Sequence, residues 1–243
     1  MLMEILLLTA LGSIAGLVGG VFFLIKNSWA RVLSHNAVPF AAGVLLSVSI
    51  INLIPEASEL AGDIAFTVVL VSFIASFLFE QFFCHLHHHE GRRNDLESAI
   101  PLVIVGDTIH NVIDGIAIAS SYLIEPKFGL VVALATFLHE TPHEIGDFGI
   151  LIKAGYTKQR TFLINLFSAL ATFPGALLVY FYFKDTPDKI GIFLAISAGI
   201  FLYLGASDFL PQVEEDSRIP GIRKYFLVIL GALVMYLQIL IKS

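Results

Sequence analysis

Long apolar blocks separated by short polar connections form the dominant pattern of this chain. The apolar blocks are about 20 residues long, which is the length an α-helix needs to cross the hydrocarbon core of a bilayer. Eight such blocks can be counted, so we expect an all-α integral membrane protein with eight transmembrane helices. The expected spans are residues 2–25, 38–60, 64–83, 99–122, 128–153, 161–183, 190–210 and 221–240.

Composition supports this interpretation. Of the 243 residues, 57% are hydrophobic and 14% are charged, and the mean hydropathy is +0.85. Soluble domains contain about 45–50% apolar and about 25% charged residues. No basic patch with interleaved aromatic residues is present, so we expect a lipid bilayer and not nucleic acid as the surrounding partner. The single cysteine, Cys84, excludes an intramolecular disulfide.

Two polar segments interrupt the fourth and fifth apolar blocks, GDTIHNVIDG at 106–115 and HETPHEIGD at 139–147. Each ionisable side chain placed in the middle of a membrane costs about 2.5–3.5 kcal/mol on insertion scales, so a cluster requires mutual pairing, water or a cation. Residues four apart share one face of a helix, as His110 and Asp114 do, and likewise His139 and His143. Seven potential metal ligands therefore occur on two adjacent helices: His110, Asn111, Asp114, His139, Glu140, His143 and Glu144.

The ligand types favour zinc. Imidazole suits zinc and iron, and carboxylate extends the range to manganese. A mixed set of histidines and carboxylates also releases an ion more readily than a closed cysteine cage, which is typical of a structural zinc. The sequence thus predicts a site through which a divalent cation passes.

Further polar residues within the spans leave alternatives open. Asp107 and Asp147 lie one turn from ligands, where they fit a supporting contact, a proton relay or part of an ion path, or else capping and pairing with Lys153. Asn52 precedes Pro55, which frees a backbone carbonyl of the second span. We expect Asn52 to form an interhelical hydrogen bond more readily than to serve as a transient ligand.

The distribution of basic residues predicts the orientation in the membrane. Connections one, three, five and seven hold ten of the fourteen lysines and arginines, which places these connections in the cytoplasm and both termini outside. The third connection, residues 84–97, is then a cytosolic histidine-rich loop. Its histidines suit weak, non-essential metal binding, although a plain solvated loop is an equal alternative: His85, His87, His88 and His89.

The sequence shows weak internal symmetry between its two halves. The second span ends in LIPE and the seventh in FLPQ, and three spans lie on each side of the central pair. An inverted repeat is a common arrangement in transporters. We therefore expect a 3+2+3 arrangement with an inverted repeat within a single transmembrane domain covering residues 1–243.

The motifs HNVIDG at 110–115 and HETPHEIGDF at 139–148 resemble those of the ZIP (Zrt/Irt-like) family of divalent metal transporters. They are most similar to the subgroup with HNxxDG on the fourth helix and HExPHExGDF on the fifth. NLIPEA in the second span, LIKAGYTKQR at 151–160 and the histidine-rich loop also resemble that subgroup. We expect no large extracellular domain ahead of the first span, in which the chain would depart from the subgroup.

The resemblance implies a binuclear metal site between the fourth and fifth of eight helices. The principal site would consist of His110, Asp114, His139 and His143. Asn111, Glu140 and Glu144 would complete or bridge a second site, with Asn165 or Ser168 of the sixth helix as a further candidate. The resemblance also implies a homodimer in a plasma or inner membrane. It implies movement of zinc, iron, manganese or cadmium toward the cytosol, with no cofactor other than the transported metal.

Two other functions remain as alternatives. HETPH satisfies HExxH, the pattern of zinc metalloproteases, in which the glutamate activates water. Pro142 disturbs the helix that would present these histidines, and HNVID supplies ligands that would close the open coordination position catalysis requires. We therefore expect no enzyme. A membrane protein with a static zinc site is the second alternative, and it predicts tight binding without flux.

Overall fold

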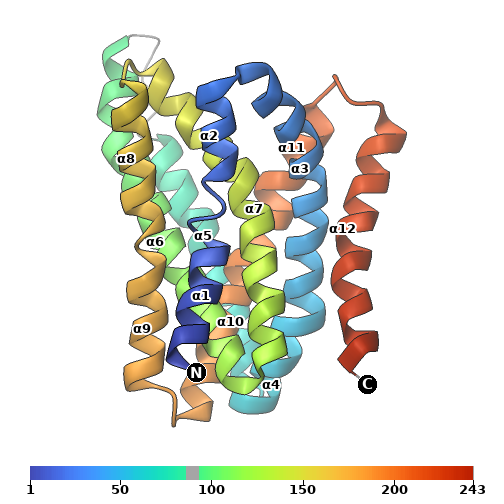
Figure 1. Ribbon diagram of the computed structural model, residues 1–243. Coiled ribbons are helices and arrows are strands. Elements are labelled where there is room, and N and C mark those ends of the chain that lie inside the picture. Colours follow the sequence, from blue (N-terminus) through green and yellow to red (C-terminus); the bar gives the residue numbers. More distant parts are fainter. Residues whose placement is uncertain (86–92, 243) are drawn as a thin grey trace.

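The computed structural model describes residues 1–85 and 93–242, and every regular element within them is a helix (Figure 1). Most are α-helices, and two are short π-helices that continue into a following α-helix. In chain order the elements are α1 (Leu2–Gly12), α2 (Val18–Ile25), α3 (Asn27–Ser47), η1 (Val48–Leu53), α4 (Ile54–Ala61), α5 (Ile64–His85), α6 (Arg93–Ile124), α7 (Pro126–Lys153), α8 (Lys158–Ala169), α9 (Thr172–Tyr182), α10 (Pro187–Tyr203), η2 (Leu204–Phe209), α11 (Leu210–Glu215) and α12 (Gly221–Lys242).

Five helical stretches among the described residues are long and apolar enough to cross a membrane, which confirms the membrane class. They coincide with five of the eight expected spans. The helix α7 has 28 residues but carries the carboxylates of its polar segment in its central turns. The five stretches are Val32–Ala61, Ile64–Gln81, Ile100–Ile124, Lys158–Tyr182 and Pro187–Glu215.

The first expected helix, residues 2–25, is interrupted in the structure. It divides into α1 and α2, with a turn at residues 13–17. Glycines on either side of the turn bring this segment very close to α7: a Cβ at Gly19 would lie 2.0 Å from the carbonyl oxygen of Thr141. The first span is therefore not one straight helix, and its backbone lies against the polar segment of α7.

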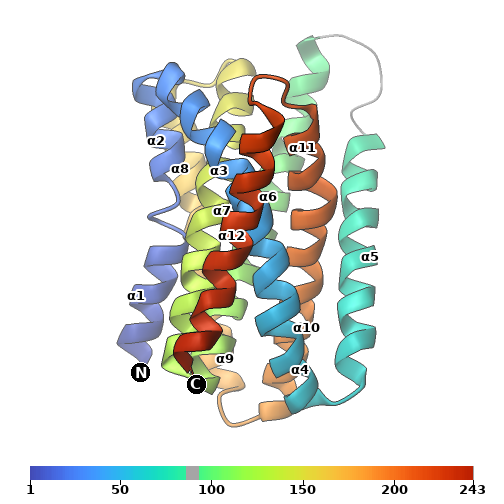
Figure 2. The ribbon, with the colours of Figure 1, turned by 90° about the vertical axis from the view of Figure 1, so that its right-hand side faces the viewer.

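Large apolar side chains cover the outer faces of the bundle. On α5 they include Phe66, Leu70 and Leu78, and on α12 they include Ile222 and Phe226, all of them exposed. Figure 2 shows α5 at one edge of the bundle. Soluble monomers rarely expose apolar surface on this scale, whereas a bilayer solvates it.

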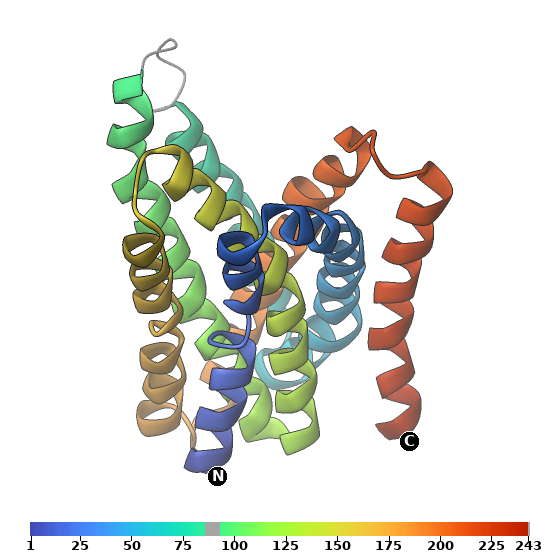
Figure 3. The same ribbon diagram turned by 45° about the horizontal axis from the view of Figure 1, so that its top comes forward.

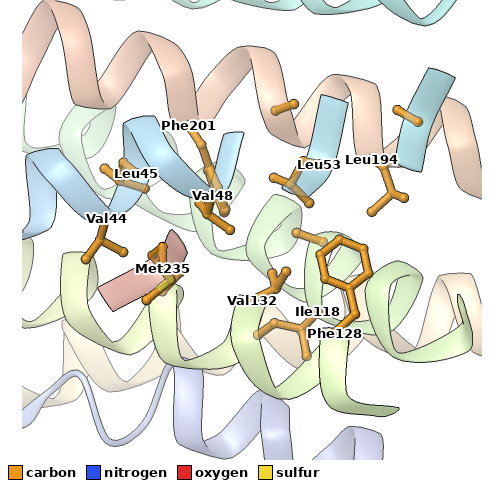
Figure 4. Close-up of a cluster of buried hydrophobic side chains, with 14 of the residues drawn as sticks. Val44, Leu45, Val48, Leu53, Ile118, Phe128, Val132, Leu194, Phe201 and Met235 are labelled. Atoms are coloured by element: carbon orange, nitrogen blue, oxygen red, sulfur yellow. The ribbon is translucent and has the colours of Figure 1, made fainter. Parts of the chain in front are cut away.

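The helix α7 lies in the middle of the bundle, with α6 and α9 on one side and α3 and α12 on the other (Figures 1 and 3). Buried aliphatic and aromatic side chains from α3, α6, α7 and α10 pack together around it, among them Leu45, Ile118, Val132 and Phe201 (Figure 4). This packing holds α6 and α7 side by side along their lengths.

The two π-helices occupy equivalent places. Each ends just before a short helix that has proline in its first turn, Pro55 in α4 and Pro211 in α11. Proline has no N–H to donate, and π-turns within longer helices often occur at functional sites. Each π-helix also contacts the helix that leads into the other, because η1 packs on α10 and η2 packs on α3.

Both ends of the chain lie at one end of the bundle (Figure 1). The connections between α2 and α3, between α7 and α8, and between α11 and α12 lie at the opposite end (Figures 1 and 2). The lysines and arginines near these three connections therefore gather at one end of the bundle.

Candidate metal centre

The polar segments of α6 and α7 meet in the interior of the bundle. Four of the expected ligands bring one ligand atom each to within 4.8 Å of all the others, and we call them the inner group: His110, Asp114, His139 and Glu140. The Nε2 atom of His110 lies 3.0 Å from Glu140 Oε1, and the Nε2 atom of His139 lies 3.4 Å from Asp114 Oδ2. The two Nε2 atoms are 3.1 Å apart.

The inner group is shielded from solvent. Asp114 and Glu140 are fully buried, and His139 is almost so. Both oxygens of Asp114 and one oxygen of Glu140 have no hydrogen-bond partner. A buried carboxylate without a partner is costly, and a bound cation removes that cost. The donor set therefore fits a divalent cation better than a purely structural contact between helices.

One histidine of the inner group is oriented by its own helix. The Nδ1 atom of His139 lies 3.0 Å from the carbonyl oxygen of Ala135, so this nitrogen carries the proton and Nε2 is left as a ligand atom. Fixing the tautomer through the far nitrogen is the usual arrangement at metal sites. The ring of Phe201 packs edge-on against the imidazole, with centroids 5.3 Å apart. The hydrophobic core thus holds this ligand in place.

A second set of ligand atoms within 4.8 Å of one another belongs to Asp107, His143 and Asp147, which we call the second group. His143 Nδ1 lies 3.3 Å from Asp147 Oδ2. The side chain of His143 is 26% exposed and that of Asp147 is 11% exposed, compared with 10% for His110, the most exposed member of the inner group. Asp107 is also largely buried.

This grouping differs from the one that the family resemblance implies. His143 lies with the second group, and Glu140 takes its place in the inner group. The reason is geometric, since each turn of an α-helix rises about 5.4 Å, and His143 lies one turn beyond His139. The chain direction reverses between α6 and α7, so the residue of α6 at that level is Asp107, one turn before His110 and Asn111.

Asn111 and Glu144, which the resemblance assigns to a second site, differ in their hydrogen bonding. The side-chain amide of Asn111 is engaged, because its Nδ2 donates to Asp107 Oδ1 at 3.1 Å and its Oδ1 accepts from Thr172 Oγ1 at 3.0 Å. Glu144 is fully buried, and neither of its oxygens has a hydrogen-bond partner. Asn111 therefore supports Asp107, whereas Glu144 keeps both oxygens available.

The remaining expected residues lie around this centre or outside it. Asn52 lies in η1 and is largely buried, and its Oδ1 has no hydrogen-bond partner. Ser168 Oγ lies 3.1 Å from Thr108 Oγ1 of α6, while the Asn165 amide donates to its own helix. Of the two candidates on the sixth span, Ser168 is thus the one that contacts the helix bearing the ligands.

The histidine-rich loop is not part of the described structure. His87, His88 and His89 lie outside the described residues, and so does the side chain of His85. Their expected metal binding stays a prediction.

Sequence reasoning missed Thr172, the α9 residue that holds Asn111. The glycines near the N-terminus also contact this site, since a Cβ at Gly16 would meet the Cβ of Glu140 at 2.7 Å. The spacing of glycines at 12, 16, 19 and 20 signals close packing. The glycine spacing does not reveal which helix packs against these residues.

Comparison with known proteins identifies the family of the chain. The sequence pattern of the ZIP zinc transporter family matches residues 96–238, which include α7 and nearly all of α6. The chain is 40% identical over 121 residues to zinc transporter ZIP4 of Rattus norvegicus, covering 50% of this chain and 18% of that protein.

Two further relatives have similar sequence identity and coverage. The chain is 35% identical over 132 residues to zinc transporter foi of Drosophila melanogaster, covering 54% of this chain and 18% of the relative. It is 36% identical over 122 residues to zinc transporter ZIP10 of Danio rerio, covering 48% and 14%. The matched segment therefore spans less than a fifth of each of these relatives. The family pattern covers more than half of the chain and includes both groups of ligands, so this multi-pass membrane protein belongs to the ZIP zinc transporter family.

Proposed function

We propose that this protein transports a divalent cation, zinc by preference, through the bundle between α6 and α7. The observation that carries the proposal is the inner group. It comprises two imidazoles and two carboxylates, all from a pair of helices that cross the membrane interior, with oxygens that have no hydrogen-bond partner. Imidazole with carboxylate suits zinc first and leaves iron, manganese and cadmium as further cargoes. Relatives that match about half of the chain are named as zinc transporters.

The helices support an eight-span arrangement of three, two and three. In this assignment α1 with α2 forms the first span, and α3 with α4 forms the second. The third to fifth are α5, α6 and α7, and the sixth to eighth are α8 with α9, α10 with α11, and α12. The equivalent π-helices η1 and η2, each packed on the helix leading into the other, support an inverted repeat of the outer helices around α6 and α7.

The proposed direction of transport is toward the cytosol. Connections rich in lysine and arginine lie at the end of the bundle opposite the two chain ends (Figure 1), and such connections favour the cytoplasmic side. Both chain ends are then outside, and the 84–97 loop is cytosolic. Assembly as a homodimer in a plasma or inner membrane is part of the same proposal and rests on the family resemblance.

The test is metal uptake into liposomes that contain only this protein, with zinc, iron and manganese compared in parallel. We expect saturable zinc flux in the wild type and none in Asp114→Ala, while the variant still inserts and elutes as the wild type does. Asp188→Asn, an exposed carboxylate beyond the polar segments, serves as the matched control and should transport normally. Stoichiometric zinc binding without flux in the wild type would replace this proposal with the static-site alternative.

The protease alternative has a separate test. Glu140 lies among the ligand atoms of the inner group, 3.0 Å from His110 and 3.4 Å from His139. A glutamate in that position acts as a ligand rather than as a base beside a bound water. Zinc-dependent cleavage of a membrane substrate that disappears in Glu140→Gln would contradict the transport proposal.

A further inference from the structure

A surface rich in cations lies at the end of the bundle that holds the α2–α3 and α7–α8 connections (Figure 1). Its members are Lys26, which separates α2 from α3, and Lys158 and Arg160 in the first turn of α8, and we call them the basic corner. The Nζ atom of Lys158 donates a hydrogen bond to the carbonyl oxygen of Leu24 at 2.7 Å. The start of α8 therefore lies against the last turn of α2, and the three cations are neighbours although they come from two distant segments.

Local structure fixes α8 in this place. Gly155 has a φ of 94°, which side chains rarely allow, and it lets the chain turn directly after α7. Thr157 then begins α8, because its hydroxyl accepts a hydrogen bond from the backbone N–H of Arg160 at 3.3 Å. Beneath this turn, Phe148 of α7 and Phe162 of α8 pack in one apolar cluster with side chains of α2. The basic corner is thus built on packed helix ends.

The segments that carry the basic corner contain no acidic residue. Residues 5–55 and 148–184 contain six lysines and arginines and neither aspartate nor glutamate, although the whole chain has 20 acidic and 14 basic residues. Among the residues that the structure describes, the ion pairs do not include Lys26, Lys158 or Arg160. The protein itself therefore leaves this positive charge without a counter-charge, and such a surface attracts external anions.

Aromatic side chains accompany two of the cations. The Nζ atom of Lys26 lies 5.1 Å from the centroid of the Trp29 ring, and Cζ of Arg160 lies 4.5 Å from that of Tyr156. Tryptophan and tyrosine concentrate where the hydrocarbon of a bilayer meets the headgroups. Trp29 is 52% exposed, and Ile25 at the end of α2 is 67% exposed. Apolar and cationic surfaces therefore adjoin here, which suits a ligand with an anionic head and apolar tails.

We propose that the basic corner binds the phosphate group of an anionic phospholipid, whose acyl chains lie along the exposed apolar side chains of α2 and α8. These include Ile25 on α2 and Phe167 on α8. A guanidinium group matches two phosphate oxygens at once, and ammonium groups add point charges. A soluble anion would leave the adjoining apolar surface unused, so the observations favour a lipid.

The bound lipid links the first span to α8 and stabilises the contact that Lys158 makes with Leu24. Anionic lipids give the cytoplasmic leaflet its negative surface potential, and the proposed orientation assigns this end of the bundle to the cytosol. Lipid binding does not depend on which ion the protein transports, or on transport itself.

The experiment is native mass spectrometry of the full chain in detergent, titrated with dioleoylphosphatidylglycerol or with dioleoylphosphatidylcholine. The wild type is compared with Lys26→Gln/Lys158→Gln/Arg160→Gln. Each lysine or arginine near an anionic surface strengthens the attraction by about fivefold, so three together contribute about 100-fold. We expect the wild type to bind phosphatidylglycerol much more tightly than phosphatidylcholine, and the triple variant to lose about 100-fold in affinity for phosphatidylglycerol alone.

The matched control is Lys127→Gln/Lys184→Gln/Lys189→Gln. It removes the same number of charges at the opposite end of the bundle (Figure 1), including Lys184, whose Nζ lies 5.5 Å from the Tyr180 ring centroid. We expect this variant to bind phosphatidylglycerol as the wild type does. An equal loss in both triple variants would show attraction to total charge and would overturn the basic corner as a site.

Two further measurements use the wild type alone and do not depend on the folding of a variant. Phosphatidylglycerol should raise Tm more than phosphatidylcholine does, and equal shifts would overturn the proposal. Inorganic phosphate and glycerol phosphate, at the concentration of the lipid, should not displace bound phosphatidylglycerol. Displacement by either would show that the basic corner binds a free anion instead of a lipid.

Discussion

The inner group and the second group occupy the same two helices but differ in setting. The inner group has two imidazoles and two carboxylates, and its most exposed side chain, His110, is 10% exposed. The second group has one imidazole and two carboxylates, and its most exposed side chain, His143, is 26% exposed. A dry, nitrogen-rich set selects zinc and holds it firmly. A more acidic set that water reaches is less selective and exchanges its ion faster. Neighbouring turns of the same two helices can therefore present candidate ligand sets that differ in nitrogen content and in exposure.

The largest effect is expected from breaking the inner group. Asp114→Asn removes a fully buried charge that lies 3.4 Å from His139. Losing only an outer partner of a metal ligand costs about 10–100-fold in affinity or activity, so losing a ligand should reduce zinc flux by about 100-fold or more. Zinc uptake into liposomes, normalised to inserted protein, measures this effect. Normal flux in Asp114→Asn would refute the inner group as the transport site.

His143→Ala should have a smaller effect than Asp114→Asn, because His143 belongs to the second group. We expect zinc flux to fall about tenfold, the lower end of the range for partners of a metal site, while one zinc ion stays bound at the inner group. Zinc counting and flux on the same preparation measure the two effects together. If His143→Ala loses the ion of the inner group, the division into two groups is wrong.

Helix spacing should influence both groups through the contact of α6 with α9. A Cβ at Gly115 would lie 1.9 Å from the carbonyl oxygen of Thr172, so Gly115→Ala must push α9 away from the residue next to Asp114. Overpacking of this kind costs about 1–3 kcal/mol, and we expect a lower Tm and several-fold lower zinc flux.

Gly146→Ala is the matched control for Gly115→Ala, since a Cβ at Gly146 meets no atom within 4 Å. We expect Gly146→Ala to leave Tm and flux unchanged. Equal losses in both variants would show that helix glycines matter generally, and not through the contact between α6 and α9.

A weaker effect is expected for Thr172→Val, which keeps the shape of the side chain and removes the hydrogen bond to Asn111. The loss of one such bond costs about 1 kcal/mol, or about fivefold. Because Asn111 orients Asp107, flux should fall by that factor while the ion of the inner group is retained. Asn111→Ala should cause a larger loss than Thr172→Val, because it also removes the hydrogen bond from Asn111 Nδ2 to Asp107 Oδ1.

The smallest effect is expected for the histidine-rich loop. Replacing the histidines at positions 85, 87, 88 and 89 by alanine should leave basal zinc flux unchanged, because the proposed transport path runs between α6 and α7. A change confined to low zinc concentrations would indicate that the loop captures or regulates the metal. Complete loss of flux would contradict the assignment of the pathway to α6 and α7.

The sequence by itself determined the membrane class, the two polar segments that lie in α6 and α7, and a set of candidate ligands. Hydrophobic block length and the spacing of four residues along a helix are local properties, and they can be read without knowing which helices are neighbours. The sequence also marks the two π-helices, since a proline closely follows each of them, in LIPE and in FLPQ.

Only the tertiary structure decided how the ligands divide. His143 shares a helix face with His139, but its level along α7 places it opposite Asp107, so it joins the second group. The same is true of Asn111, which Thr172 of another helix engages, and of Gly16, which packs on Glu140. These contacts depend on the relative axial positions of neighbouring helices. Many weak packing contacts acting together fix those positions. No periodicity within a single segment encodes that displacement.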